Sequence, residues 1–461
     1  MYFSCYQYCY EFKEGLVLMR LIKALKTVNY RLWFAILITF LLPTIYQTVR
    51  IYFLGNMPSD NGINIASQLQ WVNLLYEVVQ EALILPLFFL LGKSLNDKKE
   101  FTNKVRTGLI ITATIYFCVS IIIILCAKPL VLFMSQNDSL VNQTITYVRL
   151  ETIATLFATL WRFMMAVLIS LKKEKYLYIV LGVQMLFSIL LDTFFVSNLS
   201  ISLKWGVNGI AITNIIVNLI ILLCAVFLLC KEKIYLFSKQ KLQFAWIKEW
   251  FHVGKFSGLE SLLRNLAFMI MVVRMVNIVS EQGNYWIANN FIWQWLLLPG
   301  LALADLVKKE IAENKENIRK KTFGYLALVS IFALVWLLSI PLWKPFLRYV
   351  MNVKEYEIVF RIVLIETGFY MTYLFNSCIF DSTFYGMGKT KYMLIQSICI
   401  DGLYYGTFFI LYLTGVFNPT LMGICLMFGF GMALDFIPTL ILYLRMLKKE
   451  NIKIDFKLDT L

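Results

Sequence analysis

Charged residues are scarce in this sequence, and histidine is almost absent. Asp, Glu, Lys and Arg together make up 15% of the 461 residues, whereas a soluble domain is usually about a quarter charged. The single histidine, His252, cannot build a histidine-based metal site or a catalytic triad. The nine cysteines are scattered without metal-ligand spacing, and the chain has no phosphate-binding loop of the G-x-x-x-x-G-K-S/T type. We therefore expect no enzymatic activity, no metal and no other cofactor, and the chain offers no support for ATP-driven chemistry.

Long apolar runs are what the sequence has in abundance. Hydrophobic residues make up 60% of it, and many windows of about 20 residues are nearly free of charge, which is enough to cross roughly 30 Å of hydrocarbon. Examples are Leu109–Ala127, Ile210–Leu229 and Tyr325–Leu342. Backbone inside hydrocarbon must satisfy its own hydrogen bonds, and the alternation typical of barrel strands is absent, so these runs predict helices. The sequence therefore indicates an all-α polytopic membrane protein.

About twelve membrane spans are expected. They lie near residues 31–54, 67–92, 107–128, 143–170, 176–197, 207–230, 251–280, 284–307, 322–343, 358–386, 392–414 and 419–446.

The net charge of +15 is distributed as a topology signal. Lys and Arg gather in alternate loops, whereas loops 55–66 and 415–419 contain neither; loop 344–354 is an exception. The positive-inside rule places both termini and the long connection 231–248 in the cytoplasm. We expect a multi-pass protein of the plasma membrane, with the lipid bilayer as its surroundings and no nucleic-acid partner.

The two halves of the chain repeat one another. Arg50, Trp71, Glu151 and Tyr176 each have a counterpart 215 to 224 residues later, in Arg274, Trp293, Glu366 and Tyr392. Each half holds six spans, an even number, so the halves share one orientation and form a parallel repeat about a pseudo-twofold axis along the membrane normal. Repeats of this kind are typical of carriers with a site between or inside the halves.

This repeat predicts a domain organisation. The expected parts are a cytoplasmic segment 1–24, an amino-terminal lobe 25–230, a cytoplasmic linker 231–248, a carboxy-terminal lobe 249–447 and a cytoplasmic tail 448–461. Residues 1–18 are polar and aromatic without the apolar core of a signal peptide, and we expect them to be an extension upstream of a translation start at Met19.

Several short motifs fall in an order and spacing that resemble one family. Leu191–Val196 followed by Gly206–Ala211 is similar to the helix-five to helix-six signature of the multidrug and toxic compound extrusion (MATE) transporters. Gly92–Asn96 resembles the glycine motif after helix two, Gly254–Glu260 resembles the entry to helix seven, and Phe384–Thr390 resembles the turn between helices ten and eleven. No single motif is decisive, but their combination is fairly specific.

The resemblance covers about residues 25–450 and implies cation-coupled antiport. In that family, protons or sodium ions bind carboxylates in the amino-terminal lobe, and an organic cation leaves by alternating access. Protonation or ion binding removes the charge of a carboxylate and so changes the preferred packing of the helices around it. We therefore expect a monomeric exporter of small organic cations, coupled to H⁺ or Na⁺.

Two positions decide how far the resemblance extends to coupling. Asp192 matches the family's helix-five acid, and Ser188 stands where its asparagine partner is usual. The family's helix-one acid is replaced by Arg50, which cannot titrate at physiological pH. If Arg50 meets Asp192, the acid acts as a gate or lock rather than as a simple proton carrier. Alternatively, Asp192 belongs to a structural ion pair, and Arg50 and Arg274 both extend to the outer surface.

A polar stripe runs along the predicted helix 67–92. Its members lie three or four residues apart on one face: Gln70, Asn73, Glu77, Gln80 and Glu81. Such a stripe within a span should face protein or water rather than lipid. Its acids either replace the lost helix-one acid or pair with Arg50, Arg149 or Arg162.

Further ionisable and polar residues within spans are functional candidates by default. The resemblance implies cavity-lining roles for Tyr147 and Asn214. In the second lobe the candidates are Glu260, for which an intrahelical pair with Arg264 is expected, and then Arg274, Asp381 and Asp401. Because Asp192 and the polar stripe have no counterpart in the second lobe, the first lobe is the expected place of coupling.

Three rival functions stay open at this stage. A flippase for lipid-linked oligosaccharides shares the architecture, and Arg50, Arg162 and Arg274 suit the anionic head groups that it would move. A homologue that has lost coupling is suggested by the replacement of the helix-one acid. A membrane enzyme has the least support, because no nucleophile and base, and no metal-ligand set, is present.

Overall fold

The computed structural model describes residues 19–57, 61–92, 94, 97–171, 173, 175–236 and 241–456. The expected upstream extension, residues 1–18, lies outside the described residues. Residues 19–26 form a short helix, after which the chain is almost entirely helical, and the described residues contain no strand. The elements are α2 (Tyr30–Gly55), α3 (Asn61–Ser67), α4 (Leu69–Gly92), α5 (Lys98–Leu125), α6 (Ala127–Phe133), η1 (Asp138–Leu140), α7 (Val141–Ser170), α8 (Lys175–Phe195), α9 (Gly206–Lys231), α10 (Ile247–Phe268), η2 (Met269–Val273), α11 (Arg274–Ile278), α12 (Gln282–Phe291), η3 (Ile292–Leu296), α13 (Leu298–Glu313), α14 (Glu316–Pro345), η4 (Phe346–Val350), α15 (Tyr356–Phe375), η5 (Asn376–Asp381), α16 (Ser382–Gly386), α17 (Thr390–Ser397), η6 (Ile398–Tyr404), α18 (Tyr405–Leu413) and α19 (Leu421–Lys449).

These elements make up twelve long helical segments. Ten segments of the described chain are long and apolar enough to cross a membrane, and α12 with α13 forms an eleventh that is bent by 56°. The bend falls just before Pro299, whose ring is tolerated in the first turn of a helix but not in its interior. α4, with 24 residues, is the twelfth segment. The predicted fold class, an all-α polytopic membrane protein, is confirmed.

Several helices extend beyond the spans that hydropathy predicts. α5 begins at Lys98 rather than near residue 107, because Asp97 caps it: its Oδ1 accepts hydrogen bonds from the backbone N–H groups of Lys99 (2.9 Å) and Glu100 (3.1 Å). Hydropathy marks only the part of a helix inside hydrocarbon, whereas a cap marks its true beginning.

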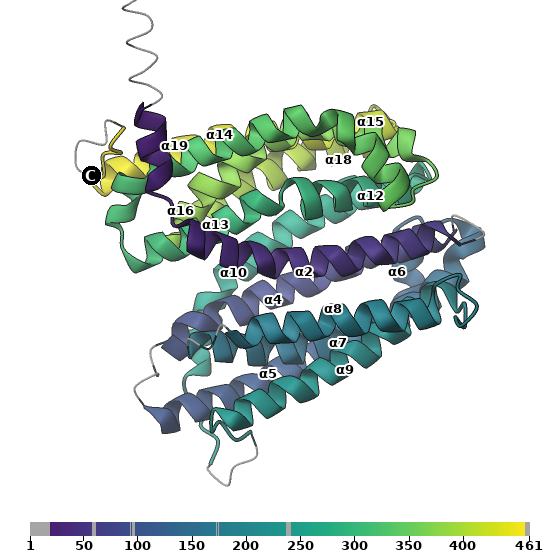
Figure 1. Ribbon diagram of the computed structural model, residues 1–461, viewed down its shortest axis with the longest axis horizontal. Coiled ribbons are helices and arrows are strands. Elements are labelled where there is room, and N and C mark those ends of the chain that lie inside the picture. The colour runs from purple at the N-terminus through teal and green to yellow at the C-terminus, as the bar shows by residue number, and fades with distance from the viewer. Residues whose placement is uncertain are drawn as a thin grey trace, which may run out of the picture.

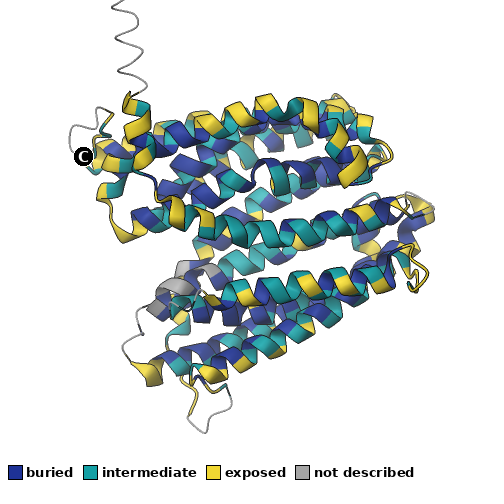
Figure 2. Ribbon diagram, in the orientation of Figure 1, coloured by how far each residue is buried: buried dark blue, intermediate teal, exposed yellow. Residues whose placement is uncertain are grey.

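The helices form two lobes that lie side by side (Figure 1). The first lobe contains α2, α4, α5, α7, α8 and α9, and the second contains the helices from α10 to α19. α2 lies between α8 of its own lobe and α13 of the other, and α4 packs along α10. Figure 2 shows buried residues inside the bundle and exposed ones on its outside, where Leu125, Phe227 and Leu338 form part of an apolar surface suited to lipid.

The contact between α4 and α10 requires a glycine. A Cβ on Gly254 would lie 2.1 Å from the carbonyl oxygen of Ala82, a distance that no side chain permits. Next to this close approach, Ser257 Oγ donates to the Glu81 carbonyl oxygen at 3.0 Å, and Trp250 Nε1 donates to that of Leu83 at 2.8 Å. The motif Gly254–Glu260 therefore holds the two lobes together.

The two lobes also meet at the end of the bundle remote from both termini, which we call the far end. Gln68 and Asn277 exchange two hydrogen bonds between their buried side-chain amides, at 2.7 and 3.1 Å. Asn352 Nδ2 donates to Asn56 Oδ1 at 2.8 Å, and a Cβ on Gly55 would lie 2.2 Å from the Asn352 carbonyl oxygen. Close backbone contact and paired amides thus close the far end between the lobes.

Five π-helical segments interrupt the described helices, and all of them follow residue 268. They are η2, η3, η4, η5 and η6. A π-helical turn inserts one residue and rotates the side chains beyond it, and such turns are frequent at functional sites. Among the described residues, π-helical turns are therefore confined to the second lobe.

Candidate functional site

Arg50 and Asp192 form an ion pair inside the first lobe. Arg50 Nε, on α2, donates to Asp192 Oδ2, on α8, at 2.8 Å; the aspartate side chain is 2% exposed and the arginine side chain 14%. The two residues meet, as one of the alternatives from the sequence required. The alternative in which Arg50 extends to the outer surface is wrong, because its guanidinium lies against a buried carboxylate.

A second acid lies close to this pair. Glu151, on α7, is 2% exposed, and both of its carboxylate oxygens accept hydrogen bonds from Asn214 Nδ2, at 2.8 and 3.0 Å. Arg50 interacts electrostatically with Glu151 as well as with Asp192. Ser188 is also buried in this region, one helical turn before Asp192. Asn214 was a candidate from the sequence, whereas Glu151 was recognised there only as a residue of the repeat.

Arg274 does not repeat the role of Arg50. Its Nε donates to the carbonyl oxygen of Phe133 at 2.7 Å, and its guanidinium lies over the rings of Phe133 and Tyr412 at 5.3 and 5.9 Å. No carboxylate bonds to it in the described part of the chain. The two arginines that occupy equivalent positions in the sequence are therefore not equivalent in their contacts.

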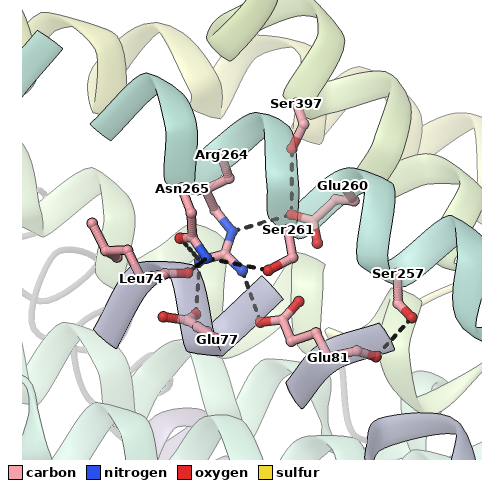
Figure 3. A network of polar contacts seen from close by, with 9 residues as sticks. All are labelled: Leu74, Glu77, Glu81, Ser257, Glu260, Ser261, Arg264, Asn265 and Ser397. Carbon is pink, nitrogen blue, oxygen red and sulfur yellow. Dashed lines mark hydrogen bonds and ion pairs between the residues drawn. The ribbon is translucent and has the colours of Figure 1, made fainter. Parts of the chain in front are cut away.

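A cluster around Arg264 joins α4 to α10 (Figure 3). The guanidinium contacts three carboxylates: Glu77 at 3.2 Å, Glu81 at 2.8 Å and Glu260 at 3.2 Å. The intrahelical pair between Glu260 and Arg264 is confirmed. Three acids around one cation leave an excess of negative charge when all of them are ionised, and the Arg264 side chain is 40% exposed, so the cluster is open to small molecules.

The expected partners of the stripe acids were wrong. Glu77 and Glu81 pair with Arg264 of the other lobe rather than with Arg50, Arg149 or Arg162. Arg149 Nε donates to the carbonyl oxygen of Ile124 at 3.2 Å, and Arg162 Nη1 to Gln80 Oε1 at 3.3 Å. Partners on different lobes depend on how the lobes pack, which helical periodicity within α4 cannot indicate.

A cavity of about 640 Å³ lies beside this cluster. The described residues give it six acidic side chains and two basic ones: Glu77, Glu260, Asp305, Asp381, Asp401, Asp435, Arg264 and Lys308. Its aromatic side chains are Phe40, Phe268, Trp293, Tyr373, Tyr385, Tyr405 and Phe428. Most of the lining comes from the second lobe, whereas the sequence pointed to the first. We call this cavity the acidic compartment.

Three of its acids have no ion pair in the described chain. Asp381 lies at the end of the π-helical segment η5, and Asp401 lies within η6. Asp435, on α19, accepts hydrogen bonds at Oδ2 from Gln396 Nε2 (2.7 Å) and Asn376 Nδ2 (2.9 Å). The remaining acids already have cations, since Lys308 bonds to Asp305 at 3.0 Å and Arg264 bonds to Glu77 and Glu260. These unpaired carboxylates give the compartment its capacity for a foreign cation.

A second cavity, of about 300 Å³, adjoins the first on the side of the far end. The two share Gln70, Leu74, Asn289 and Trp293 in their lining. The smaller one is also lined by side-chain amides and by Arg50, Tyr147 and Trp286. Of the candidates predicted from the sequence, Arg50, Asn73 and Tyr147 lie here, whereas Glu77, Glu260, Asp381 and Asp401 lie in the acidic compartment. We call this smaller cavity the amide compartment.

Some site residues could not be singled out from the sequence. Asp305 and Lys308 pair with each other three residues apart, which looks like an ordinary surface pair until the cavity beside them is known. Asp435 was recognisable as an acid within a span, but its neighbours were not. Glu366, the repeat counterpart of Glu151, is fully buried, and its carboxylate oxygens have no hydrogen bond among the described residues. The sequence signal that could have identified Glu151 and Glu366 was the presence of an acid at the equivalent position of both halves.

Ion pairs also fix the end of the bundle that carries the termini. Glu450, just beyond α19, accepts hydrogen bonds from Lys315 and Lys389, which lower its pKa to about 2. Glu232, just beyond α9, accepts hydrogen bonds from Tyr176 (2.8 Å) and Lys173 (3.2 Å), and these lower the pKa of its carboxyl. Several of the basic loop residues that served as a topology signal are thus also structural.

Several solved structures with the same arrangement of helices are transporters. A mutant of the Vibrio cholerae MATE transporter VcmN is 15% identical to this chain with a TM-score of 0.67, over 94% of this chain and 99% of that one. A MOP-superfamily transporter from Pyrococcus furiosus, whose binding pocket has reverse polarity, is 16% identical with a TM-score of 0.62, over 90% and 96%. An outward-facing multidrug resistance transporter of the MATE family is 16% identical with a TM-score of 0.61, over 92% and 96%. No protein-family model and no curated protein matches the sequence significantly. Since these likenesses extend over nearly the whole chain, this protein is a multi-pass membrane protein with the fold of the MATE transporters of the MOP superfamily.

Proposed function

We propose that this protein is a secondary active transporter that exports organic cations in exchange for H⁺ or Na⁺ by alternating access of its two lobes. The acidic compartment is the observation that carries this proposal, because it combines an excess of acids with seven aromatic side chains. Carboxylates attract a cation, and aromatic faces bind its apolar part and its charge. The proposal of this substrate class rests on the lining of the cavity rather than on the fold or the net charge of the chain.

The coupling site in this proposal lies in the second lobe. Asp192 already has a fixed cation in Arg50, which competes with an added proton or Na⁺. Asp381, Asp401 and Asp435 have no such partner in the described chain. Protons or sodium ions that compete with the substrate for these three carboxylates would make substrate release depend on ion entry.

The first-lobe cluster has a supporting role in the proposal. Arg50 and Asp192 join α2 to α8; Tyr147, Ser188 and Glu151 are buried in the same lobe, and Glu151 is bonded to Asn214. A buried pair that connects two helices fixes their register more than it adds stability. We assign these residues to a lock within the first lobe rather than to the coupling ion.

The distribution of charge also supports a proposal for the cellular setting. We propose a monomer in the plasma membrane with both termini in the cytoplasm, since the alternate basic loops obey the positive-inside rule. α9 ends at Lys231 and α10 begins at Ile247 at the end of the bundle that carries the termini, which supports a cytoplasmic linker between them. The far end, where the lobes are closed against each other, would then face the outside.

The flippase alternative fits the cavity less well. An anionic head group requires unpaired basic side chains, but Arg264 and Lys308 are each bonded to acids. Of the arginines that favoured this alternative, Arg50 is paired with Asp192, and Arg274 and Arg162 lie outside the lining of the acidic compartment. The excess of acids would repel the phosphates of a lipid-linked saccharide.

Expression in a pump-deficient host tests the proposal. The protein should lower the accumulation of a fluorescent cation such as ethidium, and an uncoupler or the removal of sodium should abolish this effect. Asp381→Asn combined with Asp435→Asn should return accumulation to that of the empty vector, while the exposed Asp138→Asn control should transport like the unmodified protein. Unchanged accumulation of several different cations, with the protein present in the membrane, would contradict the proposal.

A further inference from the structure

The polarity of the central cavity changes along its length. On α4 the residues that line it pass from the neutral Gln70 and Asn73 to the acidic Glu77. Along α12 and α13 they pass from Asn289 to Asp305 in the same direction, away from the far end. The cavity therefore has two chemically different parts, the acidic compartment and the amide compartment.

The amide compartment is rich in neutral hydrogen-bonding groups. Five side-chain amides line it: Gln47, Gln70, Asn73, Asn289 and Asn290. Arg50 is the only charged side chain among the described residues of its lining, and its bond to Asp192 offsets that charge. The compartment thus presents donors and acceptors without a net charge.

Some of these groups are free to bind a ligand. The Asn73 side chain is exposed within the cavity, and in the described structure it makes no hydrogen bond. The indole N–H of Trp286 likewise has no acceptor among the described residues. Gln70 accepts from Gln282 Nε2 at 3.3 Å through Oε1, which leaves its own amide N–H groups available. A ligand can therefore gain hydrogen bonds here without breaking ones inside the protein.

The aromatic groups add faces to these polar edges. Trp286 and Trp293 both line the compartment, and Trp293 lies on the π-helical segment η3, 36% exposed. Its indole N–H donates to Tyr370 Oη at 2.9 Å, which fixes the orientation of the ring. Amides that both donate and accept, together with tryptophan faces, suit hydroxyl groups on a carbon chain or ring.

We propose that the amide compartment binds the hydroxyl-bearing part of the substrate, so that the transported cations are hydroxylated amines. This inference rests on the proposed function: the ammonium group lies in the acidic compartment, and the hydroxyl groups lie between Asn73, Asn289 and Trp286. The shared lining residues Gln70 and Trp293 show that the two parts lie directly next to each other. An apolar cation of equal charge would leave the amides without partners and would bind through the acidic compartment alone.

A matched set of three ligands tests this proposal on the purified full-length protein by isothermal titration calorimetry. N-methylglucamine carries an amine and five hydroxyl groups. N-methylhexylamine carries the same amine on a carbon chain of the same length but has no hydroxyl group. Glucitol carries hydroxyl groups on the same carbon chain but has no amine. Asn73→Leu should weaken N-methylglucamine about tenfold, since loss of one or two hydrogen bonds has that effect. The dissociation constant for N-methylhexylamine should stay within about twofold of that of the unmodified protein, which also shows that the variant is folded.

Two further variants make the assignment specific. Trp286→Phe keeps an aromatic face and removes the N–H, and it should weaken N-methylglucamine selectively as well. Asn142→Leu, an exposed amide outside the cavity, should change neither affinity. Equal weakening of both amines by Asn73→Leu, or no weakening of either, would overturn the amide compartment as a hydroxyl site.

The outcome also separates this inference from the proposed function. Asp381→Asn combined with Asp435→Asn should weaken both amines, and glucitol should bind weakly to every variant. If this pair of substitutions leaves both amines unchanged, or if neither amine binds the unmodified protein, cation binding in the acidic compartment is refuted. If both amines depend on the aspartates but not on Asn73, only the hydroxyl assignment is refuted.

Discussion

Removal of the positive charge at Arg50 should destabilise the protein more than removal of the negative charge at Asp192. Arg50→Gln leaves Asp192 buried without its ion-pair partner and also removes the positive charge that acts at longer range on the buried Glu151. Asp192→Asn leaves Arg50 with Glu151 still within electrostatic reach. The loss of free energy should therefore be asymmetric, although both substitutions break the same ion pair.

The size of the effect follows from the geometry. Arg50 Nε and Asp192 Oδ2 are 2.8 Å apart, so the charge centres are separated by ~4 Å. At that separation two unit charges interact by about 4 kcal/mol for an effective dielectric constant of about 20. Breaking a buried pair from one side costs about 3–5 kcal/mol, which we expect for Arg50→Gln. For Asp192→Asn we expect about 1–3 kcal/mol, because a second acid remains.

Equilibrium unfolding with sodium dodecyl sulfate, followed by intrinsic fluorescence, measures these changes. The double variant Arg50→Gln/Asp192→Asn should lose less than the sum of the single losses, with a coupling of about 2 kcal/mol, since contacting residues are not additive. Arg274→Gln is the matched control, because that arginine bonds to a backbone carbonyl rather than to an acid. It should cost no more than about 1 kcal/mol. Additive losses, or a larger loss from Asp192→Asn than from Arg50→Gln, would refute an Arg50 that pairs with Asp192 and also offsets the charge of Glu151.

Three further expectations concern the contacts between the lobes and the loops. Gly254→Ala should destabilise the protein by about 2 kcal/mol or more in thermal unfolding, because the added Cβ would meet the Ala82 carbonyl oxygen. Gly182→Ala is the control: its Cβ would meet no atom within 4 Å, so it should be neutral or slightly stabilising. In a cysteine-free background, Asn56→Cys with Asn352→Cys should form a disulfide under oxidation and stop transport until reduction, since these side chains touch when the far end is closed; undiminished transport by the cross-linked protein would argue against opening there. The depressed pKa of Glu450 adds stability that is present above its ordinary pKa of 4.5 and is lost as pH falls toward about 2. Glu450→Gln should therefore flatten the pH dependence of stability below about pH 5. The slope of stability against pH near neutral pH should stay unchanged.

The spans and the fold class depend on properties that the sequence carries locally. An apolar run of about 20 residues is a helix in hydrocarbon whatever its neighbours are, because its backbone has no other hydrogen-bonding partner. The repeat of residues such as Arg50 and Arg274 gave the two lobes, and the short motifs gave the family resemblance. The pairing of Arg50 with Asp192 could also be expected, since the motifs placed both residues toward the same ends of their helices.

The composition of the site was not available in the same way. Helical periodicity showed that Glu77 and Glu81 share one face, but Arg264, their partner, belongs to the other lobe. The π-helical segments η5 and η6, which carry Asp381 and Asp401, were not predicted from the sequence. Arg50 and Arg274 correspond in the repeat, yet one meets an acid and the other a carbonyl oxygen.

The sequence by itself determined that this chain crosses a membrane many times in two related halves, because hydrophobic length and charge bias act segment by segment. Only the tertiary structure decided where the charge is available. The packing of the lobes pairs Arg50 and Arg264 with particular acids, and among the described residues it leaves Asp381, Asp401 and Asp435 around one cavity without an ion pair. The free charge of a site depends on which residues neutralise one another, and that is a property of contacts between distant segments rather than of any one of them.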